Sequence, residues 1–298
     1  MLTKLSDLHQ MARSQGGKRL VLAAAQDQNA IEAVINAHKQ GIVDVILVGD
    51  EPKIREICQK GNYDISSFEL IHEPDNERAA AISVQMVSQK KADIVMKGHL
   101  GTSCLLRAVL NKEWGLRSGE LLSHLALFEL TAYHKIIGLT DAAMNIAPDF
   151  KGKVSIVKNS VSYLQKLGIE KPKVAMLSAV ETVNPDMKSS MEAAAIAKMA
   201  ERGQISNCII DGPLAFDNAV SKKSAELKKI VSTVAGDADL LVADNLDASN
   251  AIYKSFIYFA QAKCAAVIVG AKAPIVLTSR ADNDDTKLNS IALAAAIK

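Results

Sequence analysis

The segment of residues 20–52 reads LVLAAAQDQNAIEAVINAHKQGIVDVILVGDEP and predicts a strand, a helix and a second strand in that order. Two uninterrupted apolar runs of strand length, residues 20–25 and 43–48, flank a stretch whose apolar residues recur at helical spacing. Asp27 is placed to cap the start of this helix, and Gly41 follows its end. Because strands buried on both faces need continuous apolar runs, the segment predicts one strand–helix–strand unit of a parallel sheet.

The same alternation continues to the end of the chain. Further strand-like runs are residues 70–71, 94–96, 136–139, 174–177, 209–210, 240–243, 267–269 and 275–277. Helical patterns, such as the one at residues 187–201, separate most of these runs. This order predicts an α/β protein with a mainly parallel sheet. Single cores stop growing at about 250–300 residues, so the length of 298 residues favours two lobes.

Composition and charge exclude several classes of protein. Lys and Arg number 35 against 33 Asp and Glu, and this balance argues against a dedicated nucleic-acid-binding protein. No apolar run approaches the ~20 residues of a membrane-spanning helix, and the N-terminus lacks the apolar core of a signal peptide. The four cysteines, Cys58, Cys104, Cys208 and Cys264, include no C-x-x-C pair, which suits neither a zinc site nor a disulfide framework. We therefore expect a cytoplasmic protein that binds neither nucleic acid nor a membrane.

A glycine-bearing turn follows the strand-like run at residues 94–96. In a parallel sheet, ligands bind beyond the carboxyl ends of the strands, and the backbone N–H groups of such a turn can approach an anion there. Thr102 or Ser103 is placed to cap the helix that follows, and Arg107 on that helix offers a bidentate fork. An ordinary capped turn explains the same pattern, which is neither a Walker loop nor a dinucleotide fingerprint. The candidate substrate-binding residues here are Lys97, Gly98, His99, Gly101, Thr102, Ser103 and Arg107.

Two other residues in this region are interpreted as packing residues. Cys104 is more easily explained as a buried small apolar residue than as a nucleophile near a helix start. The single tryptophan, Trp114, is interpreted as a packing residue rather than as a stacking platform.

Two more strand ends carry polar clusters. Ser279 and Arg280 follow the run at residues 275–277, and Asp282, Asp284 and Asp285 then open the last helix. Carboxylates stabilise a first helical turn by themselves, which accounts for most of the aspartates but not for a serine and an arginine at a strand end.

The third cluster, residues 244–250, follows the run at residues 240–243. Asp247 or Ser249 as a helix cap is the simpler interpretation of this cluster, and Asn250 is a further candidate substrate-binding residue. The six histidines show no metal-binding spacing, so no metal site is predicted.

Four stretches of the chain, taken together and in order, resemble the phosphate acetyl/butyryltransferase family. They are Met96-Lys97-Gly98 with Thr102 and Leu106-Arg107, then KVAMLS at 173–178, DNLDASN at 244–250 and PIVLTSRAD at 274–282. The matches extend from about residue 20 to the C-terminus, and they are more similar to the phosphate butyryltransferase branch than to the acetyltransferase branch.

The resemblance implies two α/β/α lobes with a cleft between them, as in the isocitrate and isopropylmalate dehydrogenases. Residues 1–130 with 274–298 would form the first lobe, and residues 131–273 would form the second, through which the protein forms a homodimer or a higher homo-oligomer. The implied reaction is the reversible transfer of a short acyl group, butyryl or branched, between coenzyme A and inorganic phosphate. Both partners are substrates, and no cofactor is implied.

The resemblance also implies roles for particular residues. Ser279 and Arg280 match the family's Ser-Arg pair, which implies hydrogen bonding in the transition state and phosphate binding. Arg107 matches its anion-binding arginine. Without a gap, the match places the family's general base at Thr286, so we expect the neighbouring Asp285 to be the base, with Asp282 as the alternative. The family's other N-terminal arginine has no counterpart, and Lys97 is a candidate for its role.

Two alternative functions stay open at this point. One is a metal- and nicotinamide-dependent dehydrogenase on a similar fold, in which Asp282, Asp284 and Asp285 would bind Mg²⁺, although no dinucleotide fingerprint is present. The other is a non-catalytic homologue that binds coenzyme A or an acyl phosphate, which the uncertain identity of the base suggests.

Overall fold

A computed structural model describes residues 2–277 and 283–297 of the chain. The chain divides into two compact units. Unit 1 consists of Met1–Leu5 and Leu121–Cys264, and unit 2 consists of Ser6–Glu120 and Ala265–Lys298. The lobe boundaries expected from the sequence, at 130/131 and 273/274, stay predictions.

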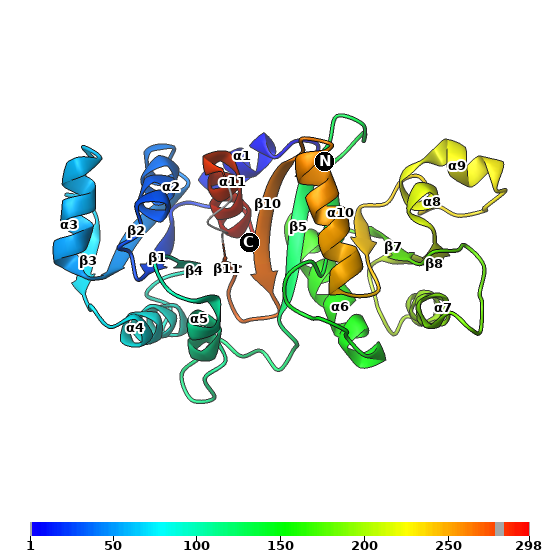
Figure 1. Cartoon of the computed structure of the whole chain (residues 1–298), viewed down its shortest axis with the longest axis horizontal. Helices are drawn as coiled ribbons and strands as arrows, with labels where there is room; N and C mark the ends of the chain where they lie inside the picture. The colour runs from blue at the N-terminus through cyan, green and yellow to red at the C-terminus, as the bar shows by residue number, and fades with distance from the viewer. Residues whose placement is uncertain (1, 278–282, 298) are drawn as a thin grey trace. The chain divides into compact units, whose positions relative to one another are not determined.

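Unit 2 contains a mainly parallel sheet with the strand order β3-β2-β1-β4-β11-β10 (Figure 1). Neighbouring strands are parallel except for the antiparallel pair of β10 and β11. The strands are β1 (Lys18–Ala23), β2 (Val43–Gly49), β3 (Glu69–His72), β4 (Ile94–Lys97), β10 (Lys263–Val269) and β11 (Ile275–Val276).

Helices cover both faces of this sheet. They are α1 (Ser6–Ser14), α2 (Gln28–Lys39), α3 (Glu51–Lys60), α4 (Asn76–Ser88), α5 (Thr102–Val109) and α11 (Asp284–Ala295). Figure 1 shows α4 and α5 side by side on one face, while α11 packs against α1 and α2 on the other.

The opening segment of the sequence analysis forms β1, α2 and β2, as predicted. The Asp27 carboxylate accepts a hydrogen bond from the Ala30 N–H at 3.0 Å and caps α2. β1 and β2 pair in parallel, and their central residues are fully buried. β1 ends two residues before its apolar run does, because the backbone turns at Ala24, whose φ is +54°.

Unit 1 also contains a mainly parallel sheet, with the strand order β5-β6-β9-β7-β8. Its strands are β5 (Ser123–Glu129), β6 (Ile137–Thr140), β7 (Lys173–Leu177), β8 (Ile209–Leu214) and β9 (Leu240–Val242). Its helices are α6 (Phe150–Lys166), α7 (Lys188–Glu201), α8 (Phe216–Val220), α9 (Lys222–Leu227) and α10 (Leu246–Tyr258). In Figure 1, α7 lies on one side of β7 and β8, and α8 and α9 lie on the other.

The sequence analysis did not predict β5, although six of its seven residues are buried. Its first residues are the buried polar pair Ser123 and His124, which interrupt the apolar pattern. β5 is also antiparallel to β6, and so it does not follow the strand–helix–strand rhythm. The α/β fold class with mainly parallel strands is nevertheless confirmed in both units. Among the described helices, none is long and apolar enough to cross a membrane.

Candidate functional site

β4 and β11 are the strands that two of the predicted polar clusters follow in the sequence, and both belong to the sheet of unit 2. The strands are parallel neighbours, with Ile275 opposite Val95 and Val276 opposite Met96. Their carboxyl ends therefore lie at the same edge, where the chain continues from Lys97 into the glycine-bearing turn. Ser279, Arg280 and Asp282 lie outside the described residues, and their roles stay predictions.

Backbone hydrogen bonds attach the glycine-bearing turn to the end of β1. The Gly98 N–H donates to the Ala23 carbonyl at 2.9 Å, and the His99 N–H donates to the Ala24 carbonyl at 2.7 Å. A Cβ atom at Gly98 would lie 2.3 Å from the Ala24 carbonyl oxygen and 2.8 Å from that of Ala23. Because both neighbours are backbone atoms, only glycine allows this close approach.

Helix α5 begins directly after the turn, and its N-cap is Gly101. The prediction that Thr102 or Ser103 caps the helix is wrong, because these residues are already its first and second helical residues. The first N–H groups of a helix have no partner within it. Those of Thr102 and Ser103 are thus placed to bind an anion at the carboxyl edge, where the helix dipole favours negative charge.

Lys97 supports this turn from its own strand. Its half-buried ammonium donates to the carbonyl oxygens of Gly98 at 3.2 Å and Leu100 at 3.3 Å. The side chain thus holds the turn together and also places a positive charge beside it. His99, by contrast, is exposed. Whether Lys97 and His99 contact substrate stays a prediction.

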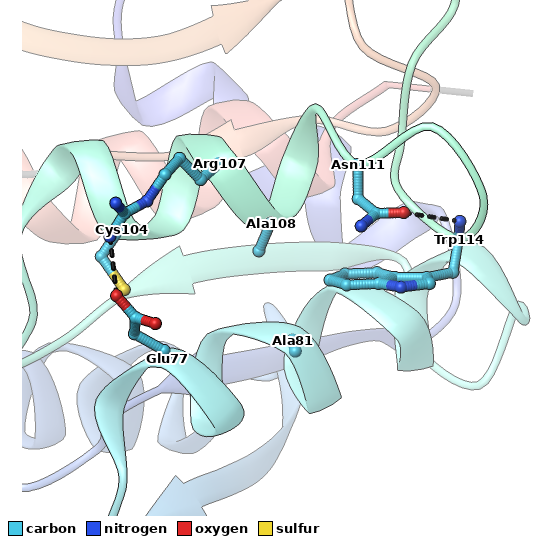
Figure 2. A pocket seen from close by; sticks show the side chains of 7 residues that line it. All are labelled: Glu77, Ala81, Cys104, Arg107, Ala108, Asn111 and Trp114. Carbon is cyan, nitrogen blue, oxygen red and sulfur yellow. Dashed lines mark hydrogen bonds and ion pairs between the residues drawn. The ribbon is translucent and has the colours of Figure 1, made fainter.

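Arg107 lines a pocket of about 340 Å³ between α4 and α5 (Figure 2). Its guanidinium pairs with the Glu77 carboxylate at 2.8 Å, and both side chains are largely exposed. The expected buried position of Cys104 is wrong, because the residue is half-buried and lines the same pocket. The full lining consists of Glu77, Ala81, Cys104, Arg107, Ala108, Asn111 and Trp114.

Trp114 also lines this pocket and is half-buried. The interpretation of Trp114 as a packing residue rather than a stacking platform stays a prediction. One feature of the sequence could have placed Trp114 near Arg107: it follows the helix that carries Arg107 by only a few residues.

Asp285 lies in the exposed first turn of α11. The Asn283 side chain caps this helix by accepting a hydrogen bond from the Thr286 N–H at 2.8 Å. Thr286 is buried, whereas Asp284 and Asp285 are exposed. The ammonium of buried Lys287 lies 3.5 Å from the Asp284 carboxylate. Of the residues at 285 and 286, Asp285 is the one with a carboxylate, which a general base needs, and its role stays a prediction.

Asn250 belongs to α10 in unit 1. It is exposed, and its amide donates to the Ala142 carbonyl at 3.2 Å. The prediction that Asp247 or Ser249 caps this helix is wrong, because the Asn245 side chain caps it by accepting from the Ala248 N–H. An asparagine is an equally good N-cap, so residue type alone did not choose among these positions.

Unit 1 also holds buried polar residues that the sequence analysis missed. The Lys153 ammonium, on α6, lies between the carboxylates of Glu192 at 2.5 Å and Asp244. The sequence around Lys153 does not indicate this pairing, because the three residues come from α6, α7 and the segment after β9. Burial lowers the pKa of His124, and the charge of nearby Asp141 opposes that shift. Among the described residues, no group of three or more His, Cys, Asp or Glu is placed to hold a metal ion.

Comparisons with known proteins match one family over nearly the whole length of the chain. The family model for "Phosphate acetyl/butaryl transferase" matches residues 4–83 and 73–295. The phosphate butyryltransferase of Clostridium acetobutylicum is 45% identical over 297 residues, which cover 100% of this chain and 99% of that protein.

Two crystal structures extend the comparison to the fold. A branched-chain phosphotransacylase from Enterococcus faecalis V583 has a TM-score of 0.84 at 33% identity, with 94% of this chain and 98% of the other covered. A 4-hydroxythreonine-4-phosphate dehydrogenase from Klebsiella pneumoniae has a TM-score of 0.60 at 11% identity, with 94% of this chain and 100% of the other covered. At this identity the likeness shows a shared fold and nothing more.

Proposed function

This chain belongs to the phosphate acetyl/butyryl transferase family, and from that premise we propose that it moves a short acyl group reversibly between coenzyme A and inorganic phosphate. We further propose that the group is butyryl or a branched relative. The observation that carries both proposals is the full-length match to a phosphate butyryltransferase at 45% identity. The likeness to a branched-chain phosphotransacylase supports the same range of acyl groups.

The proposed chemistry begins with phosphate held beside the thioester. A phosphate oxygen attacks the thioester carbonyl, the carbon–sulfur bond breaks, and the sulfur leaves as the coenzyme A thiolate. The N–H groups of Thr102 and Ser103 are placed to bind the phosphate, and positioning of this kind supplies much of the rate. In the proposal, Ser279 and Arg280 stabilise the oxyanion that forms at the carbonyl. In the reverse direction, Asp285 takes the proton from the thiol before it attacks the acyl phosphate.

We propose that coenzyme A and phosphate suffice and that no metal or other cofactor takes part. In this scheme the positive charges come from arginine and lysine side chains and from helix-start N–H groups. Activity should therefore survive prolonged dialysis against EDTA.

The first prediction concerns the dependence of thiol release on phosphate. When the purified protein is given butyryl-CoA, free thiol should appear only after phosphate or arsenate is added, because one of these anions must accept the acyl group. A colorimetric thiol assay with acetyl-, butyryl- and isobutyryl-CoA measures this and ranks the acyl groups.

Other outcomes of this assay, and two further measurements, would support the alternatives. Thiol release that ignores phosphate would identify a thioesterase. EDTA-sensitive reduction of NAD(P)⁺ with a hydroxy-acid substrate would identify a dehydrogenase. Tight binding of coenzyme A without any exchange would identify a binding protein that has lost turnover.

We propose that the protein forms a homodimer or a higher homo-oligomer through unit 1. Phe216 of α8 lies 6.1 Å, between ring centroids, from Phe256 of α10, so these helices are neighbours on one side of the unit. Helix α9 packs against α8. Large apolar side chains are exposed at the ends of α9 and α10 and just after them: Leu227, Val231, Tyr258 and Phe259. Apolar surface of this kind is typical of protein interfaces.

The second prediction is the oligomeric state and its dependence on this surface. Light scattering should give at least twice the 31.9 kDa mass of the chain, and Phe259→Glu should shift the protein toward the monomer. Phe259 is 89% exposed, so the substitution should not disturb folding of the chain. Leu110→Glu, at an exposed leucine of unit 2, is the matched control. A wild-type protein that elutes as a monomer at every concentration would contradict the proposal.

We also propose that the protein works in the cytoplasm. Its four cysteines are free thiols, three of them buried, which suits a reducing compartment. Fractionation of the source cells would test this location.

A further inference from the structure

Lys153, Glu192 and Asp244 form a largely buried ion triad in unit 1, which we call the Lys153 triad. The Lys153 ammonium contacts the Glu192 carboxylate at 2.5 Å and also contacts the carboxylate of Asp244. The side chain of Lys153 is 5% exposed, that of Glu192 is 12% exposed and that of Asp244 is 34% exposed. Lys153 is therefore enclosed by the fold, and Asp244 connects it to the surface.

The Lys153 triad lies at the carboxyl edge of the sheet in unit 1. β6, β9 and β7 are parallel neighbours, so their carboxyl ends share one edge. Asp244 follows the last residue of β9 by two positions, and its contact with Lys153 places the start of α6 at the same edge. In parallel sheets, ligands bind beyond this edge.

The stability of the fold does not account for the triad. Moving charged groups out of water is costly, and replacing a buried ion triad by apolar side chains of similar size often leaves stability unchanged or raises it. Paired charges instead fix the relative positions of the segments that carry them. Here those segments are the start of α6, the first half of α7 and the turn after β9.

The turn after β9 is tied in turn to the segment that follows β6. The Leu246 N–H donates to the Ile146 carbonyl at 3.0 Å, and the Asn250 amide donates to the Ala142 carbonyl at 3.2 Å. Asn250, a predicted substrate-binding residue, is exposed at this edge. Its position therefore depends on where the turn after β9 lies.

We propose that Lys153 is a positioning residue for the acyl transfer: by binding Asp244 it holds the turn after β9, and with it Asn250, in the place that substrate binding requires. The inference rests on the proposed function and on the predicted role of Asn250. Lys153 is buried, so it acts through Asp244 and does not touch the substrate. Small displacements of a positioning element can cost up to about 100-fold in rate.

The first variant, Asp244→Asn, removes one charge and keeps the size of the side chain. Lys153 then keeps Glu192 as a partner of opposite charge, so the protein should fold. We expect kcat/KM for butyryl-CoA to fall by about tenfold, because the turn after β9 is released. The urea midpoint of unfolding, measured on the same preparation, should shift little.

The second variant, Lys153→Met, tests the lysine itself. It should lower kcat/KM for butyryl-CoA by about tenfold, and Lys153→Arg should recover part of the activity, because it restores the charge. Lys153→Met combined with Asp244→Asn should lose no more activity than Lys153→Met alone, since both changes release the same turn. Losses that multiply in the double variant would show that Asp244 acts independently of Lys153, and the proposal would be wrong.

A triple variant covers the case in which Lys153→Met does not fold because two carboxylates are left without their ammonium. Lys153→Met, Glu192→Gln and Asp244→Asn together leave no charge in the triad, so this variant should be as stable as the wild type or more stable. It should still show the tenfold loss of kcat/KM. A folded triple variant with wild-type kcat/KM would overturn the proposal.

Lys135 of unit 1 provides the matched control. Its ammonium lies 2.9 Å from Asp237 and 2.6 Å from Asp239, and its side chain is 12% exposed. Lys135 precedes β6 and Asp239 directly precedes β9, so this ion triad lies at the opposite, amino edge of the sheet. Lys135→Met should therefore lower the urea midpoint but change kcat/KM by less than about twofold. An equal loss of kcat/KM in Lys135→Met would show that breaking any ion triad of unit 1 impairs activity, which would contradict a specific role for Lys153.

The wild-type assay separates this inference from the proposed function. If wild-type thiol release ignores phosphate, the proposed function is wrong. If release depends on phosphate while folded Lys153→Met and Asp244→Asn both keep wild-type kcat/KM, the proposed function stands and the positioning role of Lys153 is wrong.

Discussion

The Arg280→Ala enzyme should turn over butyryl-CoA and phosphate at least about 100-fold more slowly than the wild type, since loss of one group that stabilises transition-state charge has effects of this size. The guanidinium is proposed to bind phosphate and to stabilise the oxyanion. Arg280→Lys should recover part of the activity, because it keeps the charge but loses the bidentate fork. Steady-state kcat with saturating butyryl-CoA and phosphate is the measurement.

The matched control for Arg280 is an arginine outside the predicted site. Arg55 is exposed on α3 and pairs with Glu51 at 2.7 Å, so Arg55→Ala should change kcat by less than about twofold. If Arg280→Ala kept wild-type turnover while remaining folded, Arg280 would be removed from the mechanism.

The second large effect should come from Gly98→Ala, which is expected to lower kcat/KM by about 100-fold, because small displacements of a positioning element can cost that much. The added methyl would lie within 3.0 Å of two backbone carbonyl oxygens, that of Ala23 at the end of β1 and that of Ala24 directly after it. The turn must therefore move away from the strand, and with it the N–H groups at the start of α5. Overpacking of this kind should also lower the free energy of unfolding by about 1–3 kcal/mol.

Gly101→Ala, in the same turn, is the control for this prediction. At Gly101 the nearest atom to an added Cβ is the Ser103 hydroxyl oxygen at 3.8 Å, and the φ of −68° suits any residue. The loss of a favourable N-cap residue should cost up to about 1 kcal/mol in stability, and most of the activity should remain. Equal losses of activity in the two variants, measured with urea unfolding alongside, would show that the close contact at Gly98 is not what matters.

Local patterns in the sequence predicted most of the regular structure. The apolar runs at residues 43–48 and 94–96 form β2 and β4, and Asp27 caps α2 through the expected hydrogen bond. These signals succeed because a buried strand and a capped helix depend mainly on residues that are close together in the chain.

The failures have a common physical cause. β5 was missed because its antiparallel partner, rather than its own pattern, defines it as a strand. The caps of α5 and α10 were misplaced by one to four residues, since several neighbouring residues had suitable side chains and the tertiary path of the chain selected one. Within the candidate site, the pocket at Trp114 was missed because its lining comes from two helices and the turn after α5.

By itself, the sequence determined that this is an α/β protein of the phosphate acetyl/butyryl transferase family, because strand rhythm and strand-end motifs are properties of contiguous residues. The tertiary structure alone decided that β11 pairs with β4, that Lys97 donates to the carbonyls of its own turn, and that Arg107 shares a pocket with Trp114. The strand pairing and the pocket join atoms from different elements of the fold, and the hydrogen bonds of Lys97 depend on the path that its turn takes. The strength of these contacts depends on distances between atoms in the folded chain. No local pattern in the sequence encodes those distances, so only the structure shows the contacts.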